Sequence, residues 1–318
     1  MLRYILKRIL QAIPILLGIT IIVYALASAA PGSPIDMFIS NNSSMTEEAI
    51  QALEQKMGLD QPVYIQYLNW LKALFSGDMG FSYRTYEPVW DMIRIRIWPT
   101  LLLTGTALIL SLLIAIPLGA LAAYKPYSPA DYLSSGLSFL GAATPNFFAS
   151  LIFVYFFAVR LKVLPASGMY NSLSDTSLGS LIPHLILPSC VLALQLLGGF
   201  LRQMRSSMLD ALGDDYVNTA RAKGLRERAI IFIHVLRNSL IPLVSQIGLS
   251  LPLLIGGAVV TEQIFSWPGI GSLMVLSINN RDYPTIMGLT VVISTFVLVG
   301  NIIVDILYGL LDPRIRYD

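Results

Sequence analysis

Charged residues are scarce in this sequence of 318 residues: Asp, Glu, Lys and Arg make up 13%, against 55% hydrophobic residues. A soluble domain of this length would expose far more charge. Cysteine occurs once, as Cys190, which excludes an intramolecular disulfide and a zinc site built from several thiolates. The two histidines, His184 and His234, lie on different segments without a second ligand at helical spacing. We therefore expect no metal site and no catalytic residue.

Two further absences narrow the possible functions. No Gly-Lys pair occurs anywhere in the chain, so it lacks the GxxxxGK[ST] loop that binds nucleotide phosphates. The net charge is only +2 and no dense basic tract is present, so the sequence predicts no surface that binds nucleic acid. We expect no cofactor in this chain. Any energy it uses must come from a partner or from an ion gradient.

What the sequence does contain is a series of apolar runs of ~20 residues, each long enough to cross ~30 Å of hydrocarbon as a helix. These runs predict an all-α polytopic membrane protein with about six transmembrane helices. The first run is longer than the apolar core of a signal peptide, and we interpret it as a retained anchor. The predicted spans are Ile9–Ala30, Pro99–Tyr124, Leu133–Val159, Leu181–Phe200, Leu240–Val260 and Ile286–Leu311.

Lysine and arginine gather on one side of the predicted spans. The positive-inside rule then predicts that both termini and the segment 201–238 are cytoplasmic. The opposite short loops hold only Arg160, Lys162 and Arg281. Among the basic residues on the predicted cytoplasmic side are Arg3, Lys7, Arg8, Arg202, Arg205, Arg221, Lys223, Arg226, Arg228, Arg237, Arg314 and Arg316.

Residues 31–98 are outside in this topology, and they carry helix signals of their own. Thr46 followed by two glutamates predicts a helix start, Gly58 a helix end, and Pro62 the first turn of a second helix. We expect an extracellular cap of short helices. The predicted organisation is an N-terminal transmembrane helix plus cap over residues 1–98, followed by a core of five spans over residues 99–318.

The third span is interrupted by Thr144-Pro145, where a proline frees backbone carbonyls that must face protein or water. Polar and aromatic residues near this break and on two other spans are candidates for lining a translocation path. Kinks and interhelical hydrogen bonds account for them equally well. The candidate path residues are Asn146, Phe147, Gln195 and Gln246.

Residues 262–271 form a second turn-rich segment, which lies outside in the predicted topology. With Thr261 before it, its sequence is TEQIFSWPGIG. Pro268 and Gly269 favour a tight turn. The turn either packs against the bundle or contacts the pathway or a partner protein, and the sequence leaves both interpretations open.

The most informative stretch is cytoplasmic. Gly213 or Asp214 can cap a short helix, with acidic residues at its positive end and basic residues at its negative end. Gly224 is placed to end this helix after about three turns. Ala220 and Gly224 are four residues apart and define a face nearly free of side chains, which another backbone can approach closely. A capped cytosolic helix also needs no partner, so this pattern alone leaves both interpretations open.

At this stretch the sequence resembles the permease subunits of ATP-binding-cassette (ABC) importers, which share a cytoplasmic EAA loop. The motif aligns as Asn218-Thr219-Ala220 followed by Gly224, and TARAKGL followed by HVLRNSLIP resembles the branch that transports dipeptides, oligopeptides and nickel. Further similar strings are LDQPVYIQYLNWL, GDMGFSYRT, FSWPGIG, RDYP and LLDPRIR, so the resemblance covers nearly the whole chain.

The resemblance implies the binding-protein-dependent importer permease fold in a bacterial plasma membrane. It implies as partners a second homologous permease, two cytosolic ABC ATPases that bind ATP and Mg, and an extracytoplasmic solute-binding protein. The expected substrate is a di- or oligopeptide; a nickel chelate and, as another class, an ion-coupled carrier are the alternatives. The residues implied to couple the chain to an ATPase are Asp215, Tyr216, Asn218, Thr219, Ala220, Arg221, Lys223 and Gly224.

Overall fold

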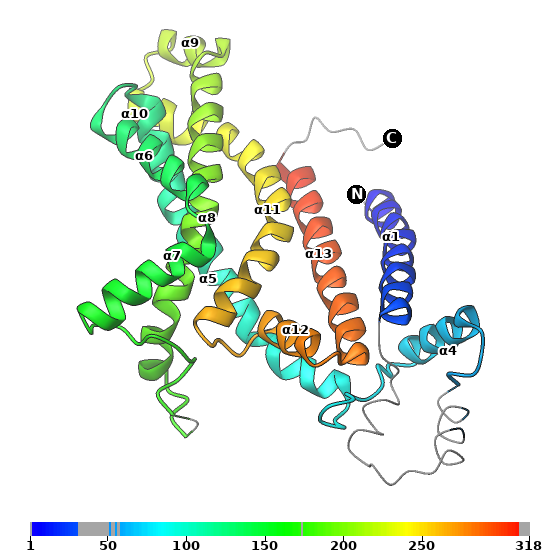
Figure 1. The fold of residues 1–318 in the computed structure, drawn as a ribbon. Helices are drawn as coiled ribbons and strands as arrows, with labels where there is room; N and C mark the ends of the chain where they lie inside the picture. The colour runs from blue at the N-terminus through cyan, green and yellow to red at the C-terminus, as the bar shows by residue number, and fades with distance from the viewer. Residues whose placement is uncertain (1, 31–50, 52–54, 56–57, 173, 312–318) are drawn as a thin grey trace. The chain divides into compact units, whose positions relative to one another are not determined.

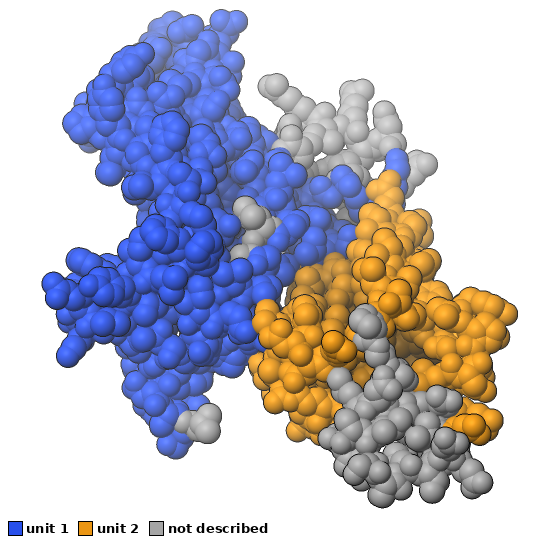
Figure 2. Space-filling model, viewed as in Figure 1, with its two compact units in different colours: residues 1–8, 98–272, 297–318 blue, residues 9–97, 273–296 orange. Residues whose placement is uncertain are grey.

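The computed structural model describes residues 2–30, 51, 55, 58–172 and 174–311. Within these ranges the regular elements are all helical (Figure 1). The chain divides into two compact units, residues 1–8, 98–272 and 297–318 (unit 1) and residues 9–97 and 273–296 (unit 2), coloured separately in Figure 2. The helices are α1 (Leu2–Ala29), α4 (Val63–Phe75), α5 (Val89–Tyr124), α6 (Pro129–Ala143), α7 (Asn146–Phe153), η1 (Val154–Arg160), α8 (Leu178–Leu212), α9 (Asp215–Ala222), α10 (Glu227–Ala229), η2 (Ile230–Val235), α11 (Leu236–Ile264), α12 (Ile270–Asn279) and α13 (Tyr283–Leu311).

Among the residues that the structure describes, five stretches are long and apolar enough to cross a membrane, and a sixth span results if one bent helix pair is counted. This agrees with the predicted all-α polytopic fold of about six spans. The five stretches are Leu6–Ala29, Val89–Tyr124, Leu178–Leu212, Glu227–Ile264 and Tyr283–Leu307.

The bent pair is α6 followed by α7 and η1, which meet at 109°. Thr144 and Pro145 at the break both have extended backbone. Pro145 disfavours helical backbone at the residue before it and lacks the N–H that would continue the helix. The predicted third span, Leu133–Val159, is thus two helices at a steep angle rather than one kinked rod.

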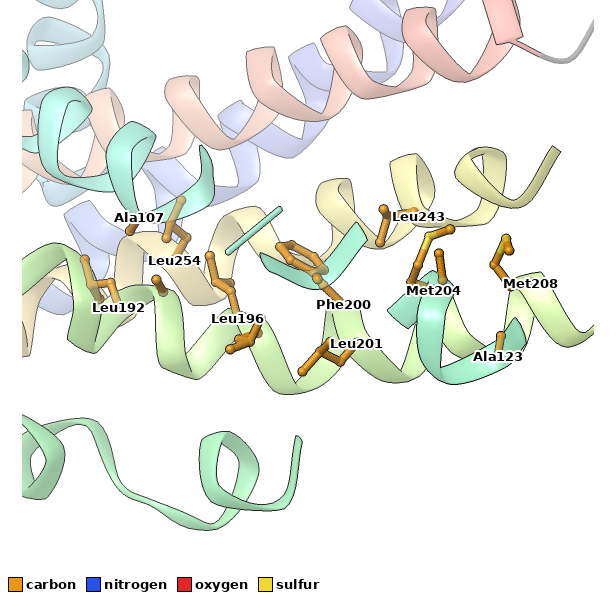
Figure 3. Close-up of a cluster of buried hydrophobic side chains, with 14 of the residues drawn as sticks. Ala107, Ala123, Leu192, Leu196, Phe200, Leu201, Met204, Met208, Leu243 and Leu254 are labelled. Carbon is orange, nitrogen blue, oxygen red and sulfur yellow. The ribbon is translucent and has the colours of Figure 1, made fainter. Parts of the chain in front are cut away.

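The core of unit 1 is built around α8, which packs against α6, α7 and α11. Figure 3 shows its buried side chains. Large residues recur along one side of α8 at helical spacing, and α11 and α5 supply their partners. The labelled members are Leu192, Leu196, Phe200, Leu201, Met204 and Met208 of α8, Leu243 and Leu254 of α11, and Ala107 and Ala123 of α5.

Two glycines allow α6 and α8 to approach closely. A Cβ added at Gly198 of α8 would lie 2.8 Å from the Ser138 carbonyl oxygen of α6. A Cβ added at Gly141 of α6 would clash with the Leu194 carbonyl oxygen of α8. Small residues at such crossings let backbones pack directly, a common device between membrane helices.

The FSWPGIG turn that follows α11 is packed inside unit 1. Trp267 is fully buried, and its indole N–H donates to the Pro99 carbonyl oxygen at 2.9 Å. Glu262 is also fully buried, and its carboxylate accepts from the Thr100 hydroxyl at 2.6 Å and from the Ser272 backbone N–H at 2.9 Å. A Cβ at Gly269 would clash with the Glu262 carboxylate. These contacts agree with the packing interpretation of this turn.

In unit 2, α1 packs on α4 through aromatic residues. The ring centroids of Tyr24 and Tyr67 are 5.5 Å apart, those of Tyr24 and Trp70 are 5.6 Å apart, and the hydroxyls of Thr20 and Tyr67 are 3.0 Å apart. The helix predicted to begin at Pro62 is therefore confirmed as α4. The helix start predicted at Thr46 lies outside the described residues.

A buried aspartate also organises unit 2. Asp282, in the RDYP string, is 2% exposed and accepts from the Ser82 hydroxyl at 2.6 Å, the Tyr83 N–H at 3.0 Å and the Thr285 hydroxyl at 2.7 Å. Three donors satisfy a carboxylate that would otherwise be costly to bury. The strings GDMGFSYRT and RDYP, far apart in the sequence, are thus joined by hydrogen bonds.

Candidate functional site

A cavity of about 440 Å³ opens in unit 1 at the break between α6 and α7, where α8 and α11 pass. Three of the four candidate path residues, Asn146, Gln195 and Gln246, lie on its wall. Phe147, the fourth, does not line this cavity and is 54% exposed. The complete lining is Gly141, Ala142, Ala143, Thr144, Pro145, Asn146, Gln195, Leu196, Gly199, Arg202, Gln246 and Ser250.

Asn146 is positioned by both the chain break and α11. It is the first residue of α7, directly after Pro145, so the break brings its side chain to the cavity wall. Its amide nitrogen donates to the Thr261 hydroxyl at 3.0 Å. Thr261 is fully buried near the end of α11, and this contact links α7, the second half of the broken span, to that helix.

The wall contributed by α8 follows from residue spacing. Gln195, Gly199 and Arg202 are four and then three residues apart, so they share one face of the helix. Gly199 faces Gln246 of α11, whose amide nitrogen would lie at an ordinary contact distance of 3.6 Å from a Cβ placed there. Gln246 and Ser250 are one turn apart on α11 and complete this wall.

From the sequence, Arg202 is predicted only to help set the membrane orientation, and Ser250 has no predicted role. Both line the cavity. A usable signal was present, because Gln195 and Arg202, like Gln246 and Ser250, repeat at helical spacing within apolar runs. The spacing could not indicate that these faces of α8 and α11 come together at the break between α6 and α7.

The predicted coupling helix is α9, Asp215–Ala222. Its N-cap is Asp214, one of the two predicted caps, although the Asp214 side chain makes no capping hydrogen bond. The helix has eight residues, about two turns, and is shorter than the three turns predicted. It is followed by Gly224, whose φ of +74° is the left-handed conformation that glycine commonly supplies after a helix.

One face of α9 packs on the chain itself. Val217 and Ala220 are 0% and 8% exposed and belong to the core cluster of unit 1, and Tyr216 packs partly against it. The prediction that Ala220 belongs to an open, side-chain-free face is therefore wrong, because the helix must bury an apolar face to stay attached. Gly224 remains open, with no atom within 4 Å of an added Cβ.

The outward face of α9 carries the other candidate residues. Asp215, Asn218, Thr219, Arg221 and Lys223 are all exposed. The Arg221 guanidinium lies 2.8 Å from the Glu227 carboxylate of α10, and this hydrogen bond raises the pKa of Arg221. The ion pair joins the two sides of the turn around Gly224. The helix thus combines a buried face, an exposed polar face and an open glycine at its end.

Comparison with protein families identifies the chain. Residues 115–317 match the family described as the binding-protein-dependent transport system inner membrane component, and residues 1–104 match the N-terminal region of such membrane components. The chain belongs to this family. These permease components are transport proteins, and the apolar helices of this chain agree with a multi-pass membrane protein.

Several curated permeases are similar over their full length. The oligopeptide transport system permease protein AppB of Bacillus subtilis is 45% identical over 318 residues, which cover 100% of both chains. A putative peptide permease protein of Brucella ovis is 42% identical over 317 residues, 99% of each chain. The dipeptide transport system permease protein DppB of Escherichia coli is 36% identical over 338 aligned positions, 100% of this chain and 99% of that one.

Proposed function

We propose that this permease is a transmembrane subunit of an ATP-driven ABC importer and forms part of the translocation path for di- or oligopeptides. The observation that carries the proposal is the cavity at the broken span, lined by Asn146, Gln195 and Gln246. Its volume of about 440 Å³ falls within the ~300–1,000 Å³ typical of small-molecule sites. The names of the AppB and DppB relatives support a peptide as the substrate.

The chemistry of the lining suits a peptide. Each Asn or Gln side chain offers an N–H donor and a carbonyl acceptor, the same pair that every peptide unit presents. Contacts of this kind hold a peptide backbone whatever its side chains are. Such a site accepts many sequences and leaves the choice among them to the binding protein.

The energy for transport is proposed to come from partners. The complex would contain a second homologous permease, two cytosolic ATPases that bind ATP and Mg, and an extracytoplasmic solute-binding protein. This chain itself would catalyse no reaction, and neither a catalytic residue nor a metal ligand is assigned to it. The exposed face of α9 with Gly224 would seat in a cleft of one ATPase. The coupling residues on that side are Asp215, Asn218, Thr219, Arg221, Lys223 and Gly224, whereas Tyr216 packs partly against the core and Ala220 is buried.

The packing of α9 supports a mechanical role. Val217 and Ala220 fasten it to the core around α8, and its contacts with η2 connect it to the start of α11. A movement of the ATPase would therefore be passed to the two helices that line the cavity. ATP binding, through its higher affinity for the closed ATPase pair, would shift the permeases between inward-open and outward-open states.

The proposed orientation puts both termini and the segment 201–238 in the cytoplasm, following the positive-inside rule. Residues 1–98 would then form the first span and an extracellular cap, and residues 99–318 the core with the coupling loop. Cysteine-accessibility labelling from either side of the membrane tests this arrangement. Labelling of a cysteine at Lys223 from outside intact cells would contradict it.

The function is tested by reconstituting the purified complex in proteoliposomes with a labelled peptide. With ATP and the ATPase subunits both on the inner side of the vesicles, ATP should drive uptake of the peptide. Collapse of the ion gradients should leave this uptake unchanged. Uptake by the solitary chain, or uptake that stops when the ion gradient collapses, would refute the importer assignment. Stimulation of ATPase activity by nickel chelates but not by peptides would refute the substrate class.

Coupling is tested at Gly224. An added Cβ meets no atom within 4 Å in the described part of the chain, so the local cost arises from the left-handed backbone, which disfavours valine by about 1–2 kcal/mol and asparagine less. We expect Gly224→Val to retain assembly and basal ATP hydrolysis but to lose most uptake per ATP hydrolysed.

Gly224→Asn is the matched control, because asparagine tolerates this backbone but adds side-chain bulk. If both variants lose coupling, the bulk blocks close approach of the ATPase. If only valine does, backbone strain is the cause. Full transport by Gly224→Val would show that this residue has no part in coupling.

A further inference from the structure

The charge on the cavity wall comes from one residue. Among the residues described around the cavity, Arg202 is charged, and the rest are amides, hydroxyl residues, glycines and apolar residues. No aspartate or glutamate lies in this lining to offset the guanidinium. A cavity with one uncompensated positive charge favours a ligand that carries a negative one.

A second cavity, of about 340 Å³, lies between α6 and α8 and includes Arg202 in its wall as well. Its polar lining consists mainly of serines, which can donate hydrogen bonds to an anion. Arg202 is therefore shared by the walls of both cavities. The residues around the second are Ser134, Ser135, Ser138, Phe139, Arg202, Arg205, Ser206 and Leu209.

The two arginines of this second cavity differ in how they are paired. Arg205 forms a two-point ion pair with Asp131, with nitrogen–oxygen distances of 2.7 and 3.1 Å, and this pair neutralises its charge. Arg202 lies 3.5 Å from the Ser138 carbonyl oxygen, a long contact to a neutral acceptor. Arg202 as a whole residue is also exposed. Arg202 is thus the charge available to a ligand in either cavity.

We propose that Arg202, from its place in the walls of both cavities, binds the C-terminal carboxylate of the peptide and selects substrates with a free carboxylate. The inference rests on the proposed function. A planar guanidinium can bind a carboxylate through two parallel hydrogen bonds, and this geometry distinguishes it from lysine. The amides of Gln195 and Gln246 lie on the same wall and can hold the peptide backbone behind that carboxylate.

The serines of the second cavity would offer the carboxylate neutral hydrogen-bond donors. Once released by Arg202, it meets hydroxyl donors rather than a second uncompensated cation, because Arg205 is held by Asp131. A conducting site must bind strongly enough to admit its substrate and weakly enough to release it. One exposed arginine followed by neutral donors meets both needs.

The experiment compares a labelled peptide with its C-terminal amide in the reconstituted complex. Both are supplied at concentrations that load the binding protein equally, determined beforehand with the isolated binding protein. The variants are Arg202→Gln, which removes the charge, and Arg202→Lys, which retains it without the planar fork. Arg160→Gln, at an exposed position away from both cavities, is the control for loss of one positive charge.

We expect Arg202→Gln to lower the ratio of acid uptake to amide uptake by about 10-fold, the scale of one charge-assisted hydrogen-bonded pair. Arg202→Lys should lower the ratio less, and Arg160→Gln should leave it unchanged. A ratio unaffected by Arg202→Gln would overturn the inference, even if both uptake rates fell equally. That equal fall is also the result expected if Arg202 only anchors a phospholipid headgroup.

A second measurement does not depend on turnover. A tripeptide with a diazirine in its C-terminal residue should label residues 195–206 of the wild-type complex, and Arg202→Gln should reduce that labelling several-fold. Equal labelling in both proteins would contradict carboxylate binding by Arg202. If the wild-type complex imports no peptide at all, the proposed function fails; if it imports peptide with an unchanged acid-to-amide ratio in the variant, only the role of Arg202 fails.

Discussion

The crossing of α6 and α8 allows a sharp test, because one of two adjacent glycines is in close contact and the other is not. A Cβ at Gly198 would lie 2.8 Å from the Ser138 carbonyl oxygen, which is closer than carbon and oxygen can pack. A Cβ at Gly199 would lie 3.6 Å from the nearest atom, an ordinary contact. Gly198→Ala must push the two helices apart, whereas Gly199→Ala need not.

The comparison isolates the packing effect. Both substitutions replace glycine by alanine inside α8, so each gains the same ~1 kcal/mol of helix propensity and the gain cancels in the difference. Forcing an extra methyl group into a packed contact costs ~1–3 kcal/mol. The atom in contact is a backbone carbonyl, which cannot rotate away as a flexible side chain can. We expect Gly198→Ala to be less stable than Gly199→Ala by about 1–3 kcal/mol.

Equilibrium unfolding of the purified protein in mixed micelles, or its melting temperature in detergent, measures this difference. The same comparison can be made within α6, where a Cβ at Gly141 clashes with the Leu194 carbonyl oxygen and one at Gly136 meets no atom within 4 Å. Gly141→Ala should therefore be the less stable of that pair. Equal stabilities within both pairs would refute the close helix crossing and the bundle packing derived from it.

Two further predictions concern buried carboxylates. Asp131→Asn removes the charge that pairs with Arg205. It should lower the unfolding free energy by about 1.5–3 kcal/mol relative to the control Asp210→Asn, which changes an exposed aspartate of α8. Equal stabilities of these two variants would show that the ion pair contributes nothing. Glu262→Ala leaves the Thr100 hydroxyl and the Ser272 N–H without their acceptor, and each unpaired donor costs about 1–3 kcal/mol of stability. This variant should therefore have a lower melting temperature than Glu262→Gln, which retains one acceptor oxygen. Identical melting temperatures for these two variants would contradict a structural role for the carboxylate.

The sequence alone was enough for the features that depend on local chemistry. Runs of ~20 apolar residues can be satisfied only by helices across hydrocarbon, so the all-α membrane fold and the count of about six spans followed directly. Pro145 cannot continue a helix, and the break lies there. Gly224 is placed where a short helix must end, and it adopts the left-handed backbone that was expected.

The tertiary structure decided which faces are buried and which distant residues meet. Ala220 looked like part of an open face, but α9 must bury an apolar side to stay attached, and Val217 and Ala220 supply it. Glu262 meets Thr100 and Ser272 only because a turn folds back on the start of the core.

The cavity shows the same division. Spacing along α8 aligns Gln195 with Arg202, and spacing along α11 aligns Gln246 with Ser250. Their meeting at the 109° break beside Asn146 depends on how three helices cross, which no periodicity within one helix encodes. Helix formation is set by neighbours along the chain, while helix crossing is set by side-chain shapes that come together only after folding.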